Sequence, residues 1–174
     1  MIQVAASVIL TVFVSTAAWL DATANRIPNT LTVTGLAAAL MLRAPLGLDA
    51  VVHGLAGVGI ALMVSLVLYA LRAIGGGDVK LLAGVGAFLG SSEIPEALGL
   101  IAVLGAAFAL LSMIRKGLLP LLLFNTLDLV KSLSSLGQAG RMRKLDSPGV
   151  LTVPYGIPIA LGTLIWWFRE GVRL

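Results

Sequence analysis

The chain has 174 residues, of which 59% are hydrophobic and only 11% are charged, and its formal net charge is +4. Soluble domains average roughly 45–50% apolar and about 25% charged residues, and the mean hydropathy of +1.04 departs in the same direction. A soluble globular protein is therefore excluded. Because the chain contains no cysteine, disulfides, thiolate nucleophiles and iron–sulfur clusters are excluded as well.

The uncharged runs of the chain predict about six transmembrane helices, because a bilayer core about 30 Å thick requires roughly 20 helical residues. The runs cover residues 1–20, 27–42, 51–71, 81–92, 97–114 and 150–168. The first run has no basic residue before Arg26 and so lacks the basic start of a cleavable signal, which predicts a retained span. The second opens at Pro28 and Asn29, which are typical of a helix start.

Two of the six runs depart from a simple span. The fourth has only 12 residues between Lys80 and Glu93, and it would cross a bilayer only if the lysine side chain reached back to the interface. The sixth is interrupted by Pro154, Gly156 and Pro158. It ends at Trp166 and Trp167, where interfacial aromatic residues are expected. A broken helix usually faces protein or water, so the interrupted part is expected to line an active-site cleft.

Residues 115–149 lie between the fifth and sixth runs. Polar residues at steps of 3, 4 and 3 share one helical face there, namely Asn125, Asp128, Ser132 and Ser135. This pattern predicts an amphipathic helix in the membrane interface rather than a seventh span. The predicted fold is thus all-α, a polytopic transmembrane helix bundle that forms one integral-membrane domain over residues 1–174.

The basic residues predict the orientation of this bundle. If the loops alternate between the two sides, nine of the twelve Lys and Arg residues fall on one side and three on the other. An excess of Lys and Arg marks the cytoplasmic face, so both termini are expected outside. The localisation predicted is the cytoplasmic (inner) membrane, with lipid as the surroundings. The basic charge is explained by orientation, and no nucleic-acid partner is expected.

Two acidic residues are not explained by solvation. Asp21 ends the first span and Asp78 begins the fourth, and the predicted topology places both at the cytoplasmic edge. Two neighbouring carboxylates cannot both ionise cheaply, so one holds a proton while the other acts as a base. Such a pair can activate water and protonate a leaving group, which suits peptide hydrolysis without a covalent intermediate. No metal or cofactor is predicted.

Glycines precede the second aspartate. Gly75, Gly76 and Gly77 have no Cβ, and we expect them to adopt positive φ and to let an extended substrate approach Asp78 closely.

These residues together resemble a known family, the GxGD membrane aspartyl proteases, and within it the type IV prepilin peptidases. The stretch Gly75–Leu81 resembles the GxGDxKL signature, and Asp21 with Arg26-Ile27-Pro28-Asn29 resembles the first-aspartate region. Residues 153–158, Val-Pro-Tyr-Gly-Ile-Pro, are similar to the motif of the last span.

The resemblance implies that Asp21 and Asp78 are the catalytic pair and that the substrate is a prepilin or pseudopilin, cut on the cytoplasmic side before its hydrophobic helix. The residues it implies as substrate-binding or supporting are Gly75, Gly76, Gly77, Lys80, Pro28, Asn29, Pro154, Tyr155 and Gly156. Larger members also methylate the new N-terminus and carry an insert with paired cysteines. This chain has neither the cysteines nor a long insert after the first span. It therefore resembles the short, peptidase-only branch of tight-adherence (Flp-type) pili.

Simpler interpretations remain for these residues. Asp78 could act only as the N-cap of its helix, Lys80 and Arg26 could only mark the membrane boundary, and His53 is expected to be a packed or interfacial residue. A small proton-coupled transporter or channel that uses the same aspartates as a relay is the main alternative function, and a non-catalytic assembly scaffold is a third. The oligomeric state does not follow from the sequence.

Overall fold

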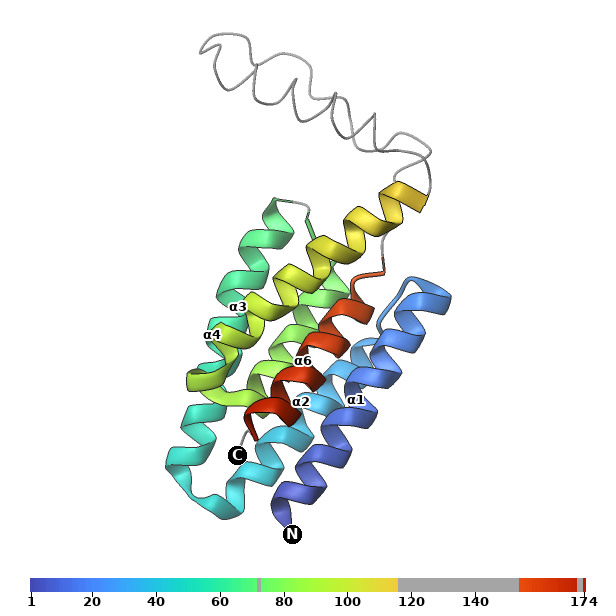
Figure 1. Cartoon of the computed structure of the whole chain (residues 1–174). Helices are drawn as coiled ribbons and strands as arrows, with labels where there is room; N and C mark the ends of the chain where they lie inside the picture. Colours follow the sequence, from blue (N-terminus) through green and yellow to red (C-terminus); the bar gives the residue numbers. More distant parts are fainter. Residues whose placement is uncertain (72, 116–153, 172–173) are drawn as a thin grey trace, which may run out of the picture. The chain divides into compact units, whose positions relative to one another are not determined.

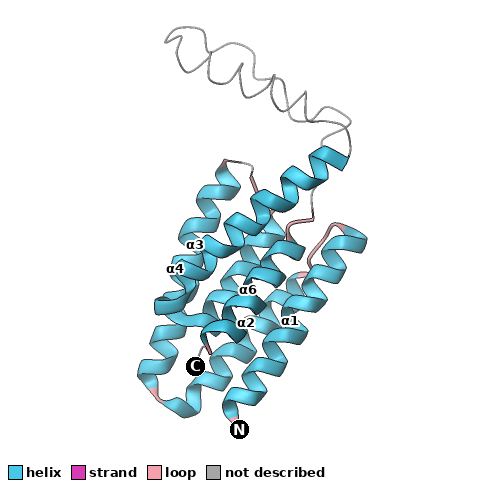
Figure 2. Cartoon of the chain, in the orientation of Figure 1, coloured by secondary structure: helices cyan, strands magenta, loops and turns pink. Residues whose placement is uncertain are grey.

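The computed structural model describes residues 1–71, 73–115, 154–171 and 174. All regular structure in these residues is helical, and no strand occurs among them (Figure 2). In chain order the helices are α1 (Ile2–Ala24), α2 (Asn29–Arg43), the 3-10 helix η1 (Ala44–Leu46), α3 (Leu48–Ala70), α4 (Gly76–Arg115) and α6 (Gly156–Glu170). The all-helical prediction is confirmed for this part of the chain.

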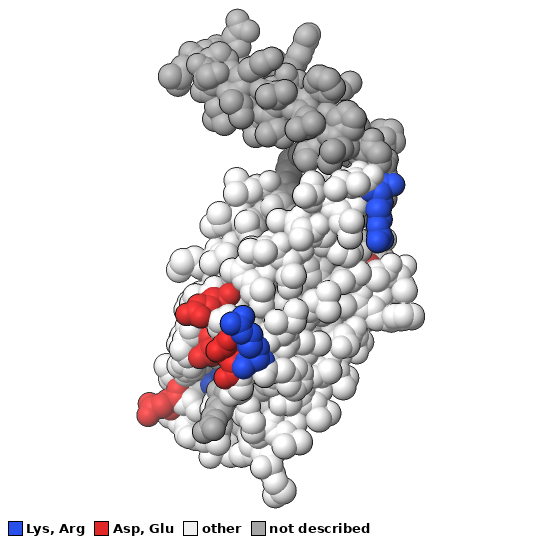
Figure 3. All heavy atoms as spheres, in the orientation of Figure 1, with Lys and Arg blue, Asp and Glu red and all other residues white. Residues whose placement is uncertain are grey.

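Within the described residues, α1, α3 and α4 are long and apolar enough to cross a membrane. Helices α2 and α6 have 15 residues each, or about 22 Å at roughly 1.5 Å per residue, which is less than the bilayer core. Charged side chains are sparse on the face drawn in Figure 3. The chain is a membrane protein, and the count of six spans stays a prediction.

The chain divides into two compact units. The first comprises Met1–Ala106 with Pro154–Leu174, and the second comprises Ala107–Val153. All the residues of the candidate site belong to the first unit. Of the second unit only residues 107–115 are described, and they continue α4 as a helix. The amphipathic helix predicted within 115–149 lies outside the described residues, apart from Arg115.

Helix α4 consists of two helical segments that meet at Gly90, whose φ of 78° and ψ of 177° are not helical. The chain reverses direction there (Figure 1), so residues 76–89 and 91–106 form an antiparallel pair. The two segments correspond to the predicted runs 81–92 and 97–114. Residues 93–96, expected to connect two spans, are helical instead. Pro95 is the fifth residue after Gly90, and its ring leaves the carbonyl four residues earlier, that of Ser91, without the usual helical donor.

The starts of α2 and α6 are set by proline and glycine. Helix α2 begins at Asn29 after Pro28, as predicted. Helix α6 begins at Gly156, with Pro154 before it and Pro158 in its first turn. The part of the predicted run before Pro154 lies outside the described residues, so an interruption of a longer span stays a prediction. The three residues open the helix, and a proline in the first turn removes an N–H that would be unpaired anyway.

Helices α1 and α6 pack along each other in opposite directions (Figure 1). At one end, the Trp167 indole donates a hydrogen bond to Ser7 Oγ over 2.9 Å, and the backbone N–H of Leu174 donates to Gln3 Oε1 over 3.3 Å. Both termini therefore lie at the same end of the first unit. Trp167 is 2% exposed, so its indole packs in the core, and the interfacial position of Trp166 and Trp167 stays a prediction.

The core of the first unit joins α1, α2 and α4 through two phenylalanines. The rings of Phe13 and Phe88 lie 6.2 Å apart between centroids. The Phe13 ring fills the space above Gly35 on α2 and Gly84 on α4, and a methyl group at Gly84 would lie 2.7 Å from it. Since Phe13 lies two turns before Asp21 on α1, this packing fixes the helix that carries Asp21 against the segment that carries Asp78.

Arg43 closes the helical segment 76–89 at its far end. Its side chain is 1% exposed. Its Nε donates to the carbonyl of Ala87 over 2.8 Å, and its Nη2 donates to the carbonyl of Phe88 over 2.9 Å. Carbonyls at a helix end have no helical partner, and the helix dipole there favours a cation. Arg43 was expected in an external loop, and this buried contact was not predicted from the sequence.

The predicted packed histidine lies beside the same break. His53 Nε2 is 3.3 Å from Ser92 Oγ, and its ring contacts the backbone of Gly90. With α3 on one side and Arg43 on the other, the break at Gly90 is enclosed by side chains from neighbouring helices. These contacts hold the far end of the segment 76–89, which carries Asp78 in its first turn.

Candidate active site

Asp21 lies in the last turn of α1 and is buried, with 9% of its surface exposed. Its Oδ2 accepts a hydrogen bond from the backbone N–H of Gly156 over 2.7 Å. Gly156 is the first residue of α6, so this N–H has no helical partner and points out of the positive end of the helix dipole. The carboxylate is thus held by a charge-assisted hydrogen bond from a different helix.

Asp78 lies in the first turn of α4 and is 7% exposed. Its Oδ2 accepts a hydrogen bond from the backbone N–H of Gly75 over 2.9 Å. The simpler interpretation had Asp78 as the N-cap, but Gly75 precedes the first helical residue, and Asp78 is the third. A side chain at the third position that reaches back to the N-cap N–H is one half of a capping box. Asp78 therefore stabilises the helix start from within the helix.

The two carboxyl groups occupy the same end of the first unit. The charge of Asp21 lies within electrostatic range of the Asp78 carboxyl group. Each carboxylate is bound through its Oδ2, and the Oδ1 of each accepts no hydrogen bond from the described residues. Two buried carboxyl groups whose second oxygens remain available, both at helix N-termini, can share a proton and bind a water molecule.

Close packing at Gly156 requires glycine. A methyl group there would lie 2.8 Å from Asp21 Cβ and 3.0 Å from its Oδ2. Contacts this short do not occur between ordinary side chains, so a larger residue would push Asp21 away from the helix N-terminus. The predicted involvement of Gly156 thus has a specific cause, which the sequence alone did not reveal.

The glycines before Asp78 behave differently from the prediction. None of Gly75, Gly76 and Gly77 has positive φ, whereas Gly47, Gly90 and Gly171 do. A methyl group at Gly76 would have room, with the nearest atom of Tyr69 at 3.7 Å, whereas one at Gly77 would lie 3.3 Å from Ile27 Cβ. The expectation of positive φ is therefore wrong, and the run instead lets α4 begin close to Ile27.

Two further predicted residues contact each other beside Asp78. The Lys80 ammonium donates a hydrogen bond to Asn29 Oδ1 over 2.6 Å, and both residues are exposed. Pro28 sits at the N-cap of α2. The lysine therefore joins the start of α2 to the first turns of α4, so that the Ile-Pro-Asn stretch and the glycine–aspartate stretch form one edge of the site.

Pro154 and Tyr155 directly precede the first helical residue of α6. Tyr155 caps the start of α6, and its ring lies against Gly105 of α4, where a methyl group would be 3.0 Å from Cε1. This contact fixes the chain immediately before Gly156, the residue that holds Asp21. The contact of this stretch with the site is thus made by a backbone group, the N–H of Gly156 at the start of α6.

A metal was not predicted, and among the described residues no group of three or more His, Asp or Glu side chains gathers in a way that could hold one. The candidate site itself contains two acidic side chains, those of Asp21 and Asp78.

The comparison with protein families identifies the chain. The model of the "Type IV leader peptidase family" matches residues 8–110, more than half of the chain, and this range contains Asp21, Pro28, Asn29, Gly75–Asp78 and Lys80. The chain belongs to the type IV leader peptidase family. Members of this family are proteases, and a leader peptidase acts on prepilins, so the resemblance predicted from the sequence is confirmed at the level of the family. No curated protein and no solved structure matches the chain.

The family match does not extend to every residue of the candidate site. Pro154, Tyr155 and Gly156 lie beyond residue 110. Their link to the site is the hydrogen bond from Gly156 to Asp21. In the leader peptidase described here, the last helix therefore contributes a backbone N–H rather than a reactive side chain.

Proposed function

We propose that this leader peptidase is an aspartic endopeptidase in which Asp21 and Asp78 act together on one water molecule. One observation carries the proposal: the two acids are buried at the same end of the bundle, and each is held through one oxygen by a backbone N–H at a helix start. Such an arrangement preorganises two carboxyl groups without neutralising them.

The chemistry needs one carboxylate and one carboxylic acid. The carboxylate removes a proton from water, and the resulting hydroxide attacks the carbonyl carbon of the scissile peptide while the acid protonates its oxygen. Collapse of the tetrahedral intermediate transfers a proton to the departing nitrogen, which leaves one carboxylic acid product and one amine. One water molecule is consumed and no covalent enzyme intermediate forms.

The substrate proposed is a prepilin or pseudopilin with a short basic leader before an apolar helix. The predicted topology puts nine of the twelve basic residues on the side of the aspartates, so cleavage is proposed at the cytoplasmic edge of the inner membrane, with both termini facing outward. The absence of cysteine and of a long insert supports the short, peptidase-only branch of Flp-type pili. A purified sample should accordingly cleave a prepilin without transferring a methyl group to the new N-terminus.

The experiment is a cleavage assay in membranes that contain the protein and a co-expressed prepilin. The parent protein should remove the leader, while Asp21→Asn and Asp78→Asn should each leave it in place at normal membrane levels. Asp49→Asn is the matched control, because Asp49 is an exposed acid in the first turn of α3. Normal trimming by either of the first two variants would refute the dyad. Lack of trimming by the parent, together with proton flux that needs both aspartates, would favour the transporter instead.

A further inference from the structure

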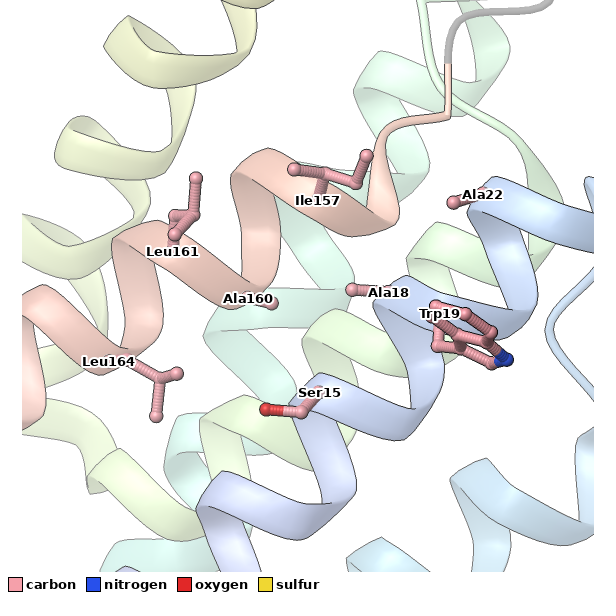
Figure 4. Close-up of a pocket in the computed structure, with 8 residues that line it drawn as sticks. All are labelled: Ser15, Ala18, Trp19, Ala22, Ile157, Ala160, Leu161 and Leu164. Carbon is pink, nitrogen blue, oxygen red and sulfur yellow. The ribbon is translucent and has the colours of Figure 1, made fainter.

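An apolar groove runs between α1 and α6 on the surface of the first unit (Figure 4). Its volume is about 340 Å³, and it is lined by Ser15, Ala18, Trp19, Ala22, Ile157, Ala160, Leu161 and Leu164. Seven of these eight residues are apolar. The groove belongs to none of the contacts described for the two aspartates.

One end of the groove is lined by residues that adjoin the candidate active site in the chain. Ala22 follows Asp21 in the chain, and Ile157 follows Gly156, whose N–H binds the Asp21 carboxylate. Both residues point into the groove in Figure 4. An occupant of the groove would therefore have one end beside the residues that follow Asp21 and Gly156 in the chain.

The shape of the lining fits a helix. Small residues, Ala18, Ala22 and Ala160, form the part contributed by the facing sides of the two helices, and small residues allow a neighbouring helix to approach closely within a membrane. Larger apolar side chains border them, with Trp19 69% and Leu161 51% exposed. An aliphatic helix can pack on such a surface without burying any polar group.

We propose that the groove between α1 and α6 binds the apolar helix of the substrate and presents the peptide bond at its cytoplasmic end to Asp21 and Asp78. This inference rests on the proposed function, in which the cut lies immediately before an apolar helix. A lipid chain could also enter an apolar groove, but a groove lined one residue away from Asp21 and Gly156 suits the substrate helix, whose scissile bond has to reach the aspartates.

Because the chain has no cysteine, disulfide cross-linking can test the contact directly. The background is Asp78→Asn, so that substrate is bound and not cut, and the probe is a prepilin with one cysteine in the first turns of its apolar helix. Leu161→Cys reports on the groove. Ile165→Cys is the matched control, because it lies one turn further along α6, is 46% exposed and does not line the groove.

The expected result is cross-linking at position 161 at least about tenfold above that at position 165. Equal yields at the two positions, or a higher yield at 165, would refute docking in the groove. The cross-linking yields test only docking in the groove. The proposed function is tested separately, and it is refuted if Asp21→Asn still cleaves prepilin. A groove occupied only by lipid would give neither cysteine an advantage.

A second measurement uses activity. Ala18→Leu fills the groove and should raise KM for a helix-bearing prepilin about five- to tenfold, with little effect on a short leader peptide that lacks the helix. Ala102→Leu is the control, because Ala102 is exposed on α4 and outside the groove. An unchanged KM for the prepilin, or an equal loss on both substrates, would contradict the proposal.

Discussion

The backbone N–H of Gly156 lies 2.7 Å from Asp21 Oδ2 and joins residues 135 positions apart in the chain. This hydrogen bond connects the last helix of the bundle to the first aspartate. It explains why a region that contributes no reactive side chain is part of the candidate site.

Gly156→Ala should therefore impair catalysis. The added methyl group would lie 2.8 Å from Asp21 Cβ, so the carboxylate must move away from the start of α6 and lose its hydrogen bond. We expect kcat to fall by about 10²-fold or more, because a displacement of about 1 Å at a catalytic group can cost this much. The measurement is prepilin cleavage by the purified variant.

The control for this variant is Gly59→Ala, since Gly59 lies inside α3 and a methyl group there meets nothing within 4 Å. It should retain full activity and gain about 0.5–1 kcal/mol of helix stability. Normal kcat in Gly156→Ala would show that the contact between α6 and Asp21 does not support the reaction.

Arg43→Met should destabilise the protein. It leaves the buried carbonyls of Ala87 and Phe88 without a donor at the break in α4, and an unsatisfied buried acceptor costs about 1–3 kcal/mol. We expect a loss of at least about 2 kcal/mol in the free energy of unfolding, measured by denaturation in detergent.

Arg169→Met provides the comparison, because the Arg169 side chain is 73% exposed in its ion pair with Glu170. Its unfolding free energy should change by less than about 1 kcal/mol. Arg43→Lys should recover only part of the loss, since an ammonium cannot reproduce the fork of a guanidinium, whose Nε and Nη2 donate to two different carbonyls. Equal stability of the Arg43 and Arg169 variants would contradict the role given to Arg43.

The predicted orientation can be checked by labelling single cysteines from one side of the membrane. Ala24→Cys is at the end of α1 next to Asp21, and Leu48→Cys is at the start of α3, at the opposite end; both positions are exposed. An impermeant thiol reagent added outside intact cells should label position 48 and not position 24. The reverse pattern would show that the aspartates face outward.

Features set by local residues could be predicted from the sequence. The start of α2 follows from Pro28 and Asn29, and the spans of α1 and α3 follow from uncharged runs that match the bilayer. For these helices the physical signal lies within a few residues of the feature that it predicts. The proposal that pairs Asp21 with Asp78 rests on the scarcity of acids and on two motifs.

Features set by packing between distant segments could not be predicted. Arg43 is a charged residue at the end of an uncharged run, which is typical of a loop. Its side chain is buried because it donates hydrogen bonds to carbonyls of α4 more than forty positions later in the chain. Trp167 stands at the end of an uncharged run, where an interfacial residue is expected. Its indole is buried and donates a hydrogen bond to Ser7, 160 positions earlier in the chain. Gly75–Gly77 were expected to have positive φ because of their composition, whereas the positive φ of the site's helix is at Gly90.

The most direct test of the account compares single-turnover cleavage of a prepilin by Asp21→Asn, Asp78→Asn and the double variant. If the two carboxyl groups act on one water molecule, each single variant loses at least about 10³-fold in rate and the double variant is slower than either by no more than about threefold, because removing one partner already disables the pair. Losses that multiply in the double variant, or a single variant that retains most of the parent rate, would contradict a shared catalytic dyad.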